Sequence, residues 1–234
     1  MPGLVPILLL CVVGTAKTLP QAVDPPPTAV DWRTKGVVAP VRSQGMGGAS
    51  QFDALTDAIA SAIAIASGSS SPPALLPGTV QLCTNATCPT ANQDCIYQYA
   101  QEKGLCLGME CDCDHPLKLA STQIIPPNDE PALQRAVVKG PVAIAVEADQ
   151  PPFQDYTRGI ESSTACGTEV DHGMVLVGYG TENGEGYWLA RNSWGTTCEY
   201  MNPAVRGKAL LPLPQACVFQ LDHSNACDAR AVGI

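Results

Sequence analysis

The stretch SQGMGGASQFDALTDAIASAIAIAS, residues 43–67, decides how this chain is interpreted. It opens with a glycine-rich turn and continues into an apolar run with the spacing of one helix face. The apolar positions are Phe52, Leu55, Ile59, Ala62, Ile63 and Ala66. The pattern predicts a long helix that begins at Ser50 and ends near Gly68.

Ser50 lies where the turn joins this helix. A serine there commonly caps the helix, because its hydroxyl accepts hydrogen bonds from backbone amides that lack partners. A nucleophile needs the same position, since a tight turn exposes it and the helix N-terminus favours negative charge. Taken alone the stretch favours the cap, so a nucleophile has to be argued from partners elsewhere in the chain.

Composition narrows the classes of partner. The chain has 234 residues and a net charge of −9, with 15% charged residues and no basic run. Such a chain can bury a substantial core, and its acidity disfavours nucleic acid and anionic membranes. Cys111-Asp112-Cys113 with His115 fits no standard zinc spacing. We expect a monomer without metal or cofactor.

The N-terminus and the cysteines indicate export. Residues 1–16 combine an apolar run with the small residues Gly14-Thr15-Ala16, as a secretory signal does; a short buried or anchoring segment is the alternative. Ten of the eleven cysteines follow this segment, an even number that suits disulfides. Asn85-Ala86-Thr87 is then a glycosylation acceptor. We expect a secreted protein or one of a lysosomal or vacuolar lumen.

The remaining patterns predict an α+β fold, with helices first and strands second. A proline-rich arm covers residues 17–29, and a loop rich in Gly, Ser and Pro covers 67–78. Further helices are expected at 93–103 and 129–139, and strands at 142–148, 173–180, 186–194, 205–211 and 217–221. We expect a helical lobe at 30–120 and a β lobe at 121–234, meeting at a cleft.

The second half offers partners for Ser50. His172 precedes an apolar strand, Asn192 follows the next strand, and Gln44 lies six residues before Ser50. Acyl transfer needs a nucleophile, an imidazole that takes its proton, a group that holds the imidazole tautomer, and donors for the developing oxyanion. Ser50, His172, Asn192 and Gln44 provide one residue for each role.

The sequence motifs around these residues resemble those of the papain-like cysteine peptidases, that is, the cathepsin L group and its relatives. They are VDWRTKGVVAPVRSQG at 30–45, PFQDYTRGI at 152–160, CGTEVDHGMVLVGYG at 166–180 and GYWLARNSWG at 186–195. The spacing from Ser50 to His172 and Asn192 also fits such enzymes. The resemblance implies a two-lobe papain-like fold, with a helical first lobe, a β-barrel-like second lobe and the active site between them.

The same resemblance implies further assignments. Cys166 and Cys217 match a disulfide of the second lobe. Peptide or protein substrate would lie in the cleft, against Gly48, Ala49, Val170, Gly173 and Trp194. Only residues 17–29 separate the expected signal from the segment that resembles the N-terminus of the mature peptidases, which leaves no room for the family's long inhibitory pro-segment.

The departures from the family are chemically important. Ser50 stands where the family has its nucleophilic Cys, Gln51 where it has an aromatic residue, and Gly47 where it has a disulfide Cys. Cys88 matches the partner of that lost Cys, so it needs a new partner or stays free. The family's Cys-x-Gly-Gly, whose backbone binds substrate, has become residues 88–91, Cys-Pro-Thr-Ala.

Three functions remain open at this point. The first is a hydrolase that cleaves peptides or esters with Ser50 as a weak nucleophile, because Asn192 brings no charge behind His172 and Asp171 is expected on the opposite face of its strand. The second is a secreted, catalytically silent homologue that binds through the cleft. The third is a silicatein-like silica-condensing protein, since Gly48–Ser50 and Tyr187–Ala190 also resemble sequence motifs of silicateins.

Overall fold

The computed structural model describes residues 25–45, 50–84, 87–88, 93–105, 119, 122–126, 129–156, 159–161, 169–195, 218–222 and 230–233. Several expectations therefore fall outside the described residues: the signal at 1–16, most of the arm at 17–29, the strand at 205–211, and Gly48, Ala49, Asn85, Cys166 and Cys217. Among the helices that are described, none is long and apolar enough to cross a bilayer.

The helices occupy mainly the first half of the chain, as expected. They are η1 (Trp32–Lys35), α1 (Ser50–Ser67), α2 (Pro77–Thr84), α3 (Gln93–Glu102), α4 (Glu130–Lys139) and α5 (Pro151–Gln154). The predictions for α1, α3 and α4 are confirmed to within about two residues, the usual uncertainty of a helix end. The prediction of a loop through Gly78 is wrong at its end, because α2 begins at Pro77, and proline suits a first helical turn.

The strands form one sheet. They are β1 (Val30–Asp31), β2 (Gln123–Ile125), β3 (Val142–Val146), β4 (Ile160–Glu161), β5 (His172–Glu182), β6 (Glu185–Arg191), β7 (Val218–Asp222) and β8 (Arg230–Gly233). Their order is β2-β8-β3-β5-β6-β7-β4, and β1 pairs with β5. All neighbours are antiparallel except β4 and β7. The α+β expectation is confirmed.

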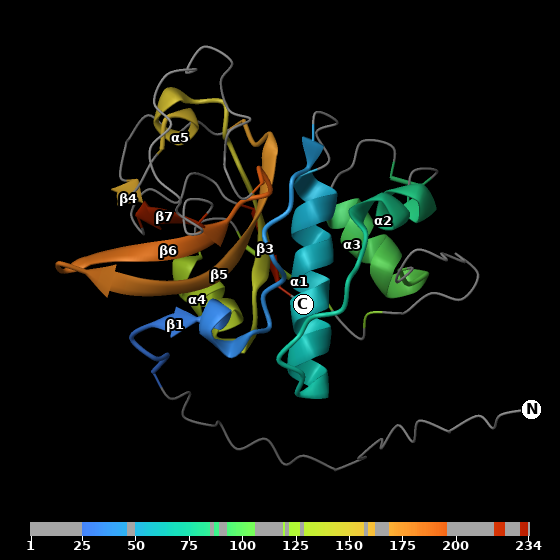
Figure 1. Cartoon of the computed structure of the whole chain (residues 1–234), viewed down its shortest axis with the longest axis horizontal. Coiled ribbons are helices and arrows are strands. Elements are labelled where there is room, and N and C mark those ends of the chain that lie inside the picture. The colour runs from blue at the N-terminus through green and yellow to red at the C-terminus, as the bar shows by residue number, and fades with distance from the viewer. Residues whose placement is uncertain are drawn as a thin grey trace, which may run out of the picture.

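Helix α1 stands between the sheet and helices α2 and α3 (Figure 1). Its apolar face packs with Val175, Val177 and Leu189 of the sheet in one core cluster. Met174 and Leu176, which alternate with those residues along β5, pack with α4 in a second cluster. Both faces of β5 are therefore covered, which explains why this strand is almost continuously apolar.

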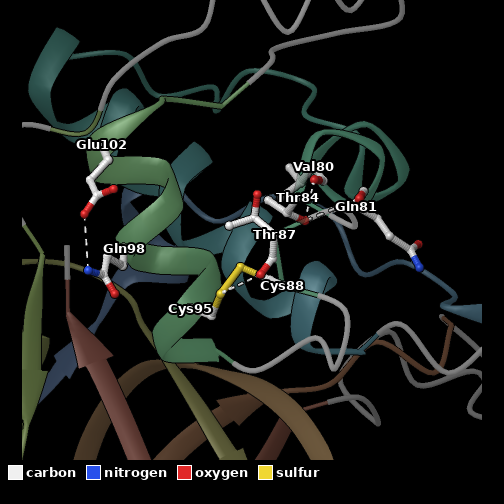
Figure 2. The surroundings of a disulfide bond; sticks show 8 residues. All are labelled: Val80, Gln81, Thr84, Thr87, Cys88, Cys95, Gln98 and Glu102. Atoms are coloured by element: carbon white, nitrogen blue, oxygen red, sulfur yellow. Dashed lines mark hydrogen bonds between the residues drawn. A yellow bond between two sulfur atoms is a disulfide. The ribbon is translucent and has the colours of Figure 1, made fainter.

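Cys88 has a new partner in this chain. It forms a disulfide with Cys95, seven residues later, at the start of α3 (Figure 2). The bond joins the segment after α2 to α3, beside Thr84 and Thr87. The sequence had left Cys88 either free or paired with an unnamed cysteine, and the structure identifies that cysteine.

Candidate active site

Neighbouring strands place His172 and Asn192 together. β5 begins at His172, and β6 ends at Arg191, the residue before Asn192. The two strands are antiparallel, with Val175 opposite Arg191, so the start of one meets the end of the other. His172 Nε2 lies 2.7 Å from Asn192 Oδ1, in a buried contact. The predicted pairing of these residues is thus present in the structure.

A second hydrogen bond determines which nitrogen of His172 carries the proton. Asn192 Oδ1 also accepts a hydrogen bond from the backbone N–H of Ser193, at 2.7 Å. The atom facing His172 is therefore an acceptor, and His172 Nε2 must be the donor. In the neutral imidazole, Nδ1 is then unprotonated and can accept a proton from a nucleophile.

Aromatic side chains surround the imidazole. The His172 and Trp194 ring centroids are 4.8 Å apart, and Phe153 of α5 lies edge-on to Trp194 at 5.4 Å. Burial lowers the pKa of His172, although the hydrogen bond to Asn192 and the charge of Asp171 act in the opposite direction. The neutral imidazole is therefore the favoured form, as a general base requires.

Ser50 is the first residue of α1 and is buried. Its Oγ accepts a hydrogen bond from the backbone N–H of Gly173 at 3.0 Å, and it donates to Gln51 Oε1 at 3.3 Å. The hydroxyl therefore faces the residue that follows His172, on the opposing strand. In the described part of the chain the partners of this hydroxyl are the Gly173 amide and Gln51 Oε1, neither of them a first-turn amide of α1, so the helix-cap interpretation finds no support.

Gly173 allows this close approach of helix and strand. A Cβ at residue 173 would lie 2.7 Å from the Ser50 carbonyl oxygen and 2.8 Å from Gln51 Cα. Such distances are far below ordinary contact, and both atoms belong to backbone. Only glycine therefore lets β5 pass α1 where Ser50 meets the start of the strand.

Gln44 is held by Ser193, the residue that follows Asn192. Its backbone N–H donates to the Ser193 carbonyl at 2.8 Å, and its Oε1 accepts from Ser193 Oγ at 2.6 Å. Because Oε1 is occupied, the NH2 end of the carboxamide is the part available to a ligand. This is the group that an oxyanion donor must supply.

Asp171 does not stand behind the imidazole. Its Oδ1 accepts a hydrogen bond from the backbone N–H of Ala148 at 2.7 Å. The nitrogen that could face a carboxylate, His172 Nε2, already meets Asn192. The structure thus agrees with the expectation that Asp171 is a poor substitute for the carboxylate of a serine triad.

Three of the predicted substrate-binding residues, Val170, Gly173 and Trp194, are among the described residues. Val170 is partly exposed just before His172, and Gly173 and Trp194 contact Ser50 and His172.

Sequence reasoning missed Ser193, whose hydroxyl holds Gln44, and a buried charge cluster of Arg42, Asp57 and Arg191. The available signal for the cluster was two aspartates inside the apolar pattern of α1.

Comparison with known proteins gives the same assignment. The family model "Papain family cysteine protease" matches residues 26–201. The low-temperature-induced cysteine proteinase of Solanum lycopersicum is 36% identical over 200 residues, which is 77% of this chain and 56% of that protein. The oryzain beta chain of Oryza sativa subsp. japonica is 34% identical over 75% of this chain and 41% of its own length. The chain spans about half the length of these relatives.

Solved structures agree. Procathepsin L2 proteinase of the Tenebrio molitor larval midgut superposes with a TM-score of 0.69 at 28% identity, covering 88% of this chain and 67% of that one. Bromelain of Ananas comosus, in complex with the E64 inhibitor, gives a TM-score of 0.70 at 23% identity, covering 88% and 98%; at that identity it shows the fold alone. The chain therefore belongs to the papain family of cysteine proteases.

Proposed function

We propose that this protein is a hydrolase that cleaves peptide or ester bonds by acyl transfer on Ser50. Ser50 Oγ forms a bond to the substrate carbonyl carbon while its proton passes to His172 Nδ1. His172 returns that proton to the leaving group, and water then attacks the acyl-enzyme by the same route. Gln44 donates to the oxyanion, and Asn192 holds the imidazole.

One observation carries this proposal. The two acceptor contacts of Asn192 Oδ1 leave His172 Nδ1 as the basic nitrogen of a buried imidazole whose pKa is lowered. A cysteine site works through a thiolate beside an imidazolium, whereas a serine site needs a neutral imidazole. The environment of His172 suits the serine.

The activity is expected to be weak. The imidazole becomes charged as it takes the serine proton, and serine enzymes place a carboxylate behind it. Asn192 brings an amide there instead. Replacing that carboxylate by an amide in a serine triad lowers turnover about 10⁴-fold, so slow ester cleavage is easier to observe than peptide cleavage.

A catalytically silent protein that binds peptides in the same place is the second candidate. It is favoured by the hydrogen bonds of Ser50, whose hydroxyl donates to Gln51 Oε1 and accepts from the Gly173 amide. Neither bond activates the oxygen.

Labelling with a fluorophosphonate separates the two. A nucleophilic Ser50 forms a stable adduct at residue 50, identifiable by mass spectrometry, and Ser50→Ala abolishes it. A catalytically silent protein gives the same background labelling with the wild-type chain and with Ser50→Ala. Ser50→Cys adds a second arm, since gained peptidase activity would show that His172 and Gln44 are placed for catalysis.

The compartment and ligands follow from the same proposal. We place the protein in an oxidising lumen or outside the cell, which the Cys88–Cys95 disulfide supports. It would act as a monomer on a peptide or protein ligand. Bromelain binds the inhibitor E64 in its solved structure, which is a reason to test that compound on the Ser50→Cys variant.

A further inference from the structure

A charge cluster joins the chain segments that carry the proposed site residues. Asp57 Oδ1 accepts hydrogen bonds from Arg42 Nε at 3.0 Å and Nη2 at 2.8 Å, and Asp57 Oδ2 pairs with Arg191 Nη2. The side chains of Asp57 and Arg191 are each 3% exposed and that of Arg42 is 22% exposed. One buried carboxylate therefore links a buried guanidinium group with a partly buried one.

The three residues come from the three segments that carry the reactive groups. Asp57 lies on α1, two turns after Ser50. Arg42 precedes Gln44 by two residues, and Arg191 directly precedes Asn192. Arg42 also donates to the Leu75 carbonyl, and Arg191 to the Ala39 carbonyl, so each guanidinium is anchored at a second point.

Stability alone is a weak explanation for such a cluster. Buried ion pairs lose much of their attraction to desolvation, and apolar replacements are often neutral or stabilising. What this arrangement supplies is direction, because the planar guanidinium fork fixes both distance and angle at a carboxylate. The cluster thus restrains how α1, the Gln44 segment and the end of β6 lie relative to one another.

We propose that Asp57 is a positioning residue, whose carboxylate holds the segments bearing Ser50, Gln44 and Asn192 in reactive alignment. The inference rests on the proposed function for the identity of the site. It adds a requirement that lies outside the site itself, since Asp57 shares α1 with Ser50 and reaches the Gln44 and Asn192 segments through Arg42 and Arg191.

Asp53 provides a matched control. It lies on α1, one turn nearer to Ser50, and is 5% exposed. Burial raises its pKa to about 6 and the charges of Arg42 and Arg191 oppose that rise, so it is part of the same electrostatic environment. Among the described residues, Asp53 accepts no hydrogen bond from either arginine. Asp53→Asn therefore removes a buried charge without cutting the link that Asp57 makes.

The test uses the Ser50→Cys background, so that it does not depend on the strength of Ser50 as a nucleophile. The rate of alkylation by iodoacetamide is measured against pH, which gives the pKa of the Cys thiol. Alignment with His172 and the helix N-terminus should hold that pKa below its ordinary value of about 8.5. Removing a nearby negative charge without any misalignment would lower it further.

Positioning predicts the opposite sign for Asp57→Asn. We expect the thiol pKa to rise and the alkylation rate at pH 6 to fall at least about tenfold, as the thiolate loses its partners. Asp57→Glu should recover part of the rate, because it restores the carboxylate at nearly the same place. Asp53→Asn should leave the rate within about threefold.

The outcomes are decisive in either direction. Equal changes for Asp57→Asn and Asp53→Asn, or a fall in melting temperature without a shift of the thiol pKa, would overturn the proposal. If Asp57→Asn does not fold, Arg42→Lys keeps the charge but loses the fork; an unshifted thiol pKa there overturns it equally. Failure of the proposed function shows separately, as absent fluorophosphonate labelling of wild-type Ser50.

Discussion

The oxygen of Ser50 and the amide of Asn192 together set what this site can do. Serine keeps its proton until the moment of attack, so the base has to be neutral beforehand. His172 meets that condition, because burial lowers its pKa and Asn192 holds its Nε2 proton. At the scale of single residues the chemistry that we propose is therefore that of a serine hydrolase, carried by a papain-family fold.

The pH dependence of Ser50 acylation follows from this. Only the neutral imidazole accepts a proton, so the labelling rate should rise with pH through the His172 pKa, which lies below 6.5, and stay level above it. We would measure fluorophosphonate labelling of the wild-type chain from pH 4 to pH 9. A rate that falls as the pH rises towards neutrality would contradict neutral His172 as the base.

Asn192→Asp should strengthen Ser50. The new carboxylate would accept the same two hydrogen bonds, from His172 Nε2 and the Ser193 amide, and would stabilise the imidazolium that forms during attack. We expect labelling to quicken by about 10- to 10³-fold, measured with the same probe. Asn192→Asp combined with Ser50→Ala is the control for labelling elsewhere. A folded variant that reacts no faster would indicate that Ser50 is not attacking through His172.

At the scale of elements, the approach of α1 to β5 is the most demanding contact near the site. Gly173→Ala would force a Cβ to within 2.7 Å of the Ser50 carbonyl oxygen, so helix and strand have to separate. We expect a loss of about 1–3 kcal/mol in the free energy of unfolding, as for other overpacked positions, measured by urea denaturation.

Gly78→Ala is the matched control. Gly78 lies in α2, and nothing comes within 4 Å of a Cβ built there. Alanine also favours a helix by about 1 kcal/mol over glycine, so this change should be neutral or stabilising. Equal destabilisation by the two substitutions would argue against the close packing of Ser50 on Gly173.

The elements with a strong period were predictable, and those without one were not. α1 repeats its apolar residues over five turns, and β5 and β6 are β-branched or aromatic and bounded by Gly. α2 was missed because Pro77 and Gly78 indicate a turn unless the helix is known to start there. Two-residue strands such as β1 and β4 exist only through pairing with distant partners.

The site divides in the same way. Ser50, His172, Asn192 and Gln44 could be proposed as site residues because recognisable sequence motifs carry them. The bond from Ser193 to Gln44 and the link from Asp57 to two arginines depend on which segments become neighbours in space, and sequence order does not encode that directly. The isolated bridge between Ser43 and Trp194 is the tertiary contact that aligns Gln44 with Ser193.

At the scale of the whole molecule, two apolar clusters cover opposite faces of the sheet, and charge is buried on the α1 side. Burial lowers the pKa of Arg191 to about 10, so both arginines remain positive at neutral pH. Asp57 makes the ion pairs with them, whereas Asp53 is attracted by both charges but accepts no hydrogen bond from either arginine within the described residues. Helix α1 thus holds two buried carboxylates, and burying their charge costs very different amounts of free energy.

Asp53→Asn should stabilise the fold above pH 6. Burial raises the pKa of Asp53 from 3.8 to about 6, so the folded protein binds a proton more tightly than the unfolded chain does. The contribution of Asp53 to wild-type stability therefore falls as pH rises between about 4 and 6, and the full cost of its buried charge is present above that range. A shift of this size corresponds to on the order of 3 kcal/mol at pH 7.5.

Urea denaturation at pH 4 and pH 7.5 checks this expectation. The advantage of Asp53→Asn should be near zero at pH 4, where the wild-type carboxyl is protonated in the folded state, and large at pH 7.5. Asp57→Asn should behave in the opposite way at pH 7.5, because it leaves two buried guanidinium groups without their shared partner. An advantage of Asp53→Asn that is equal at both pH values would show that its charge is not the cause, since only ionisation depends on pH.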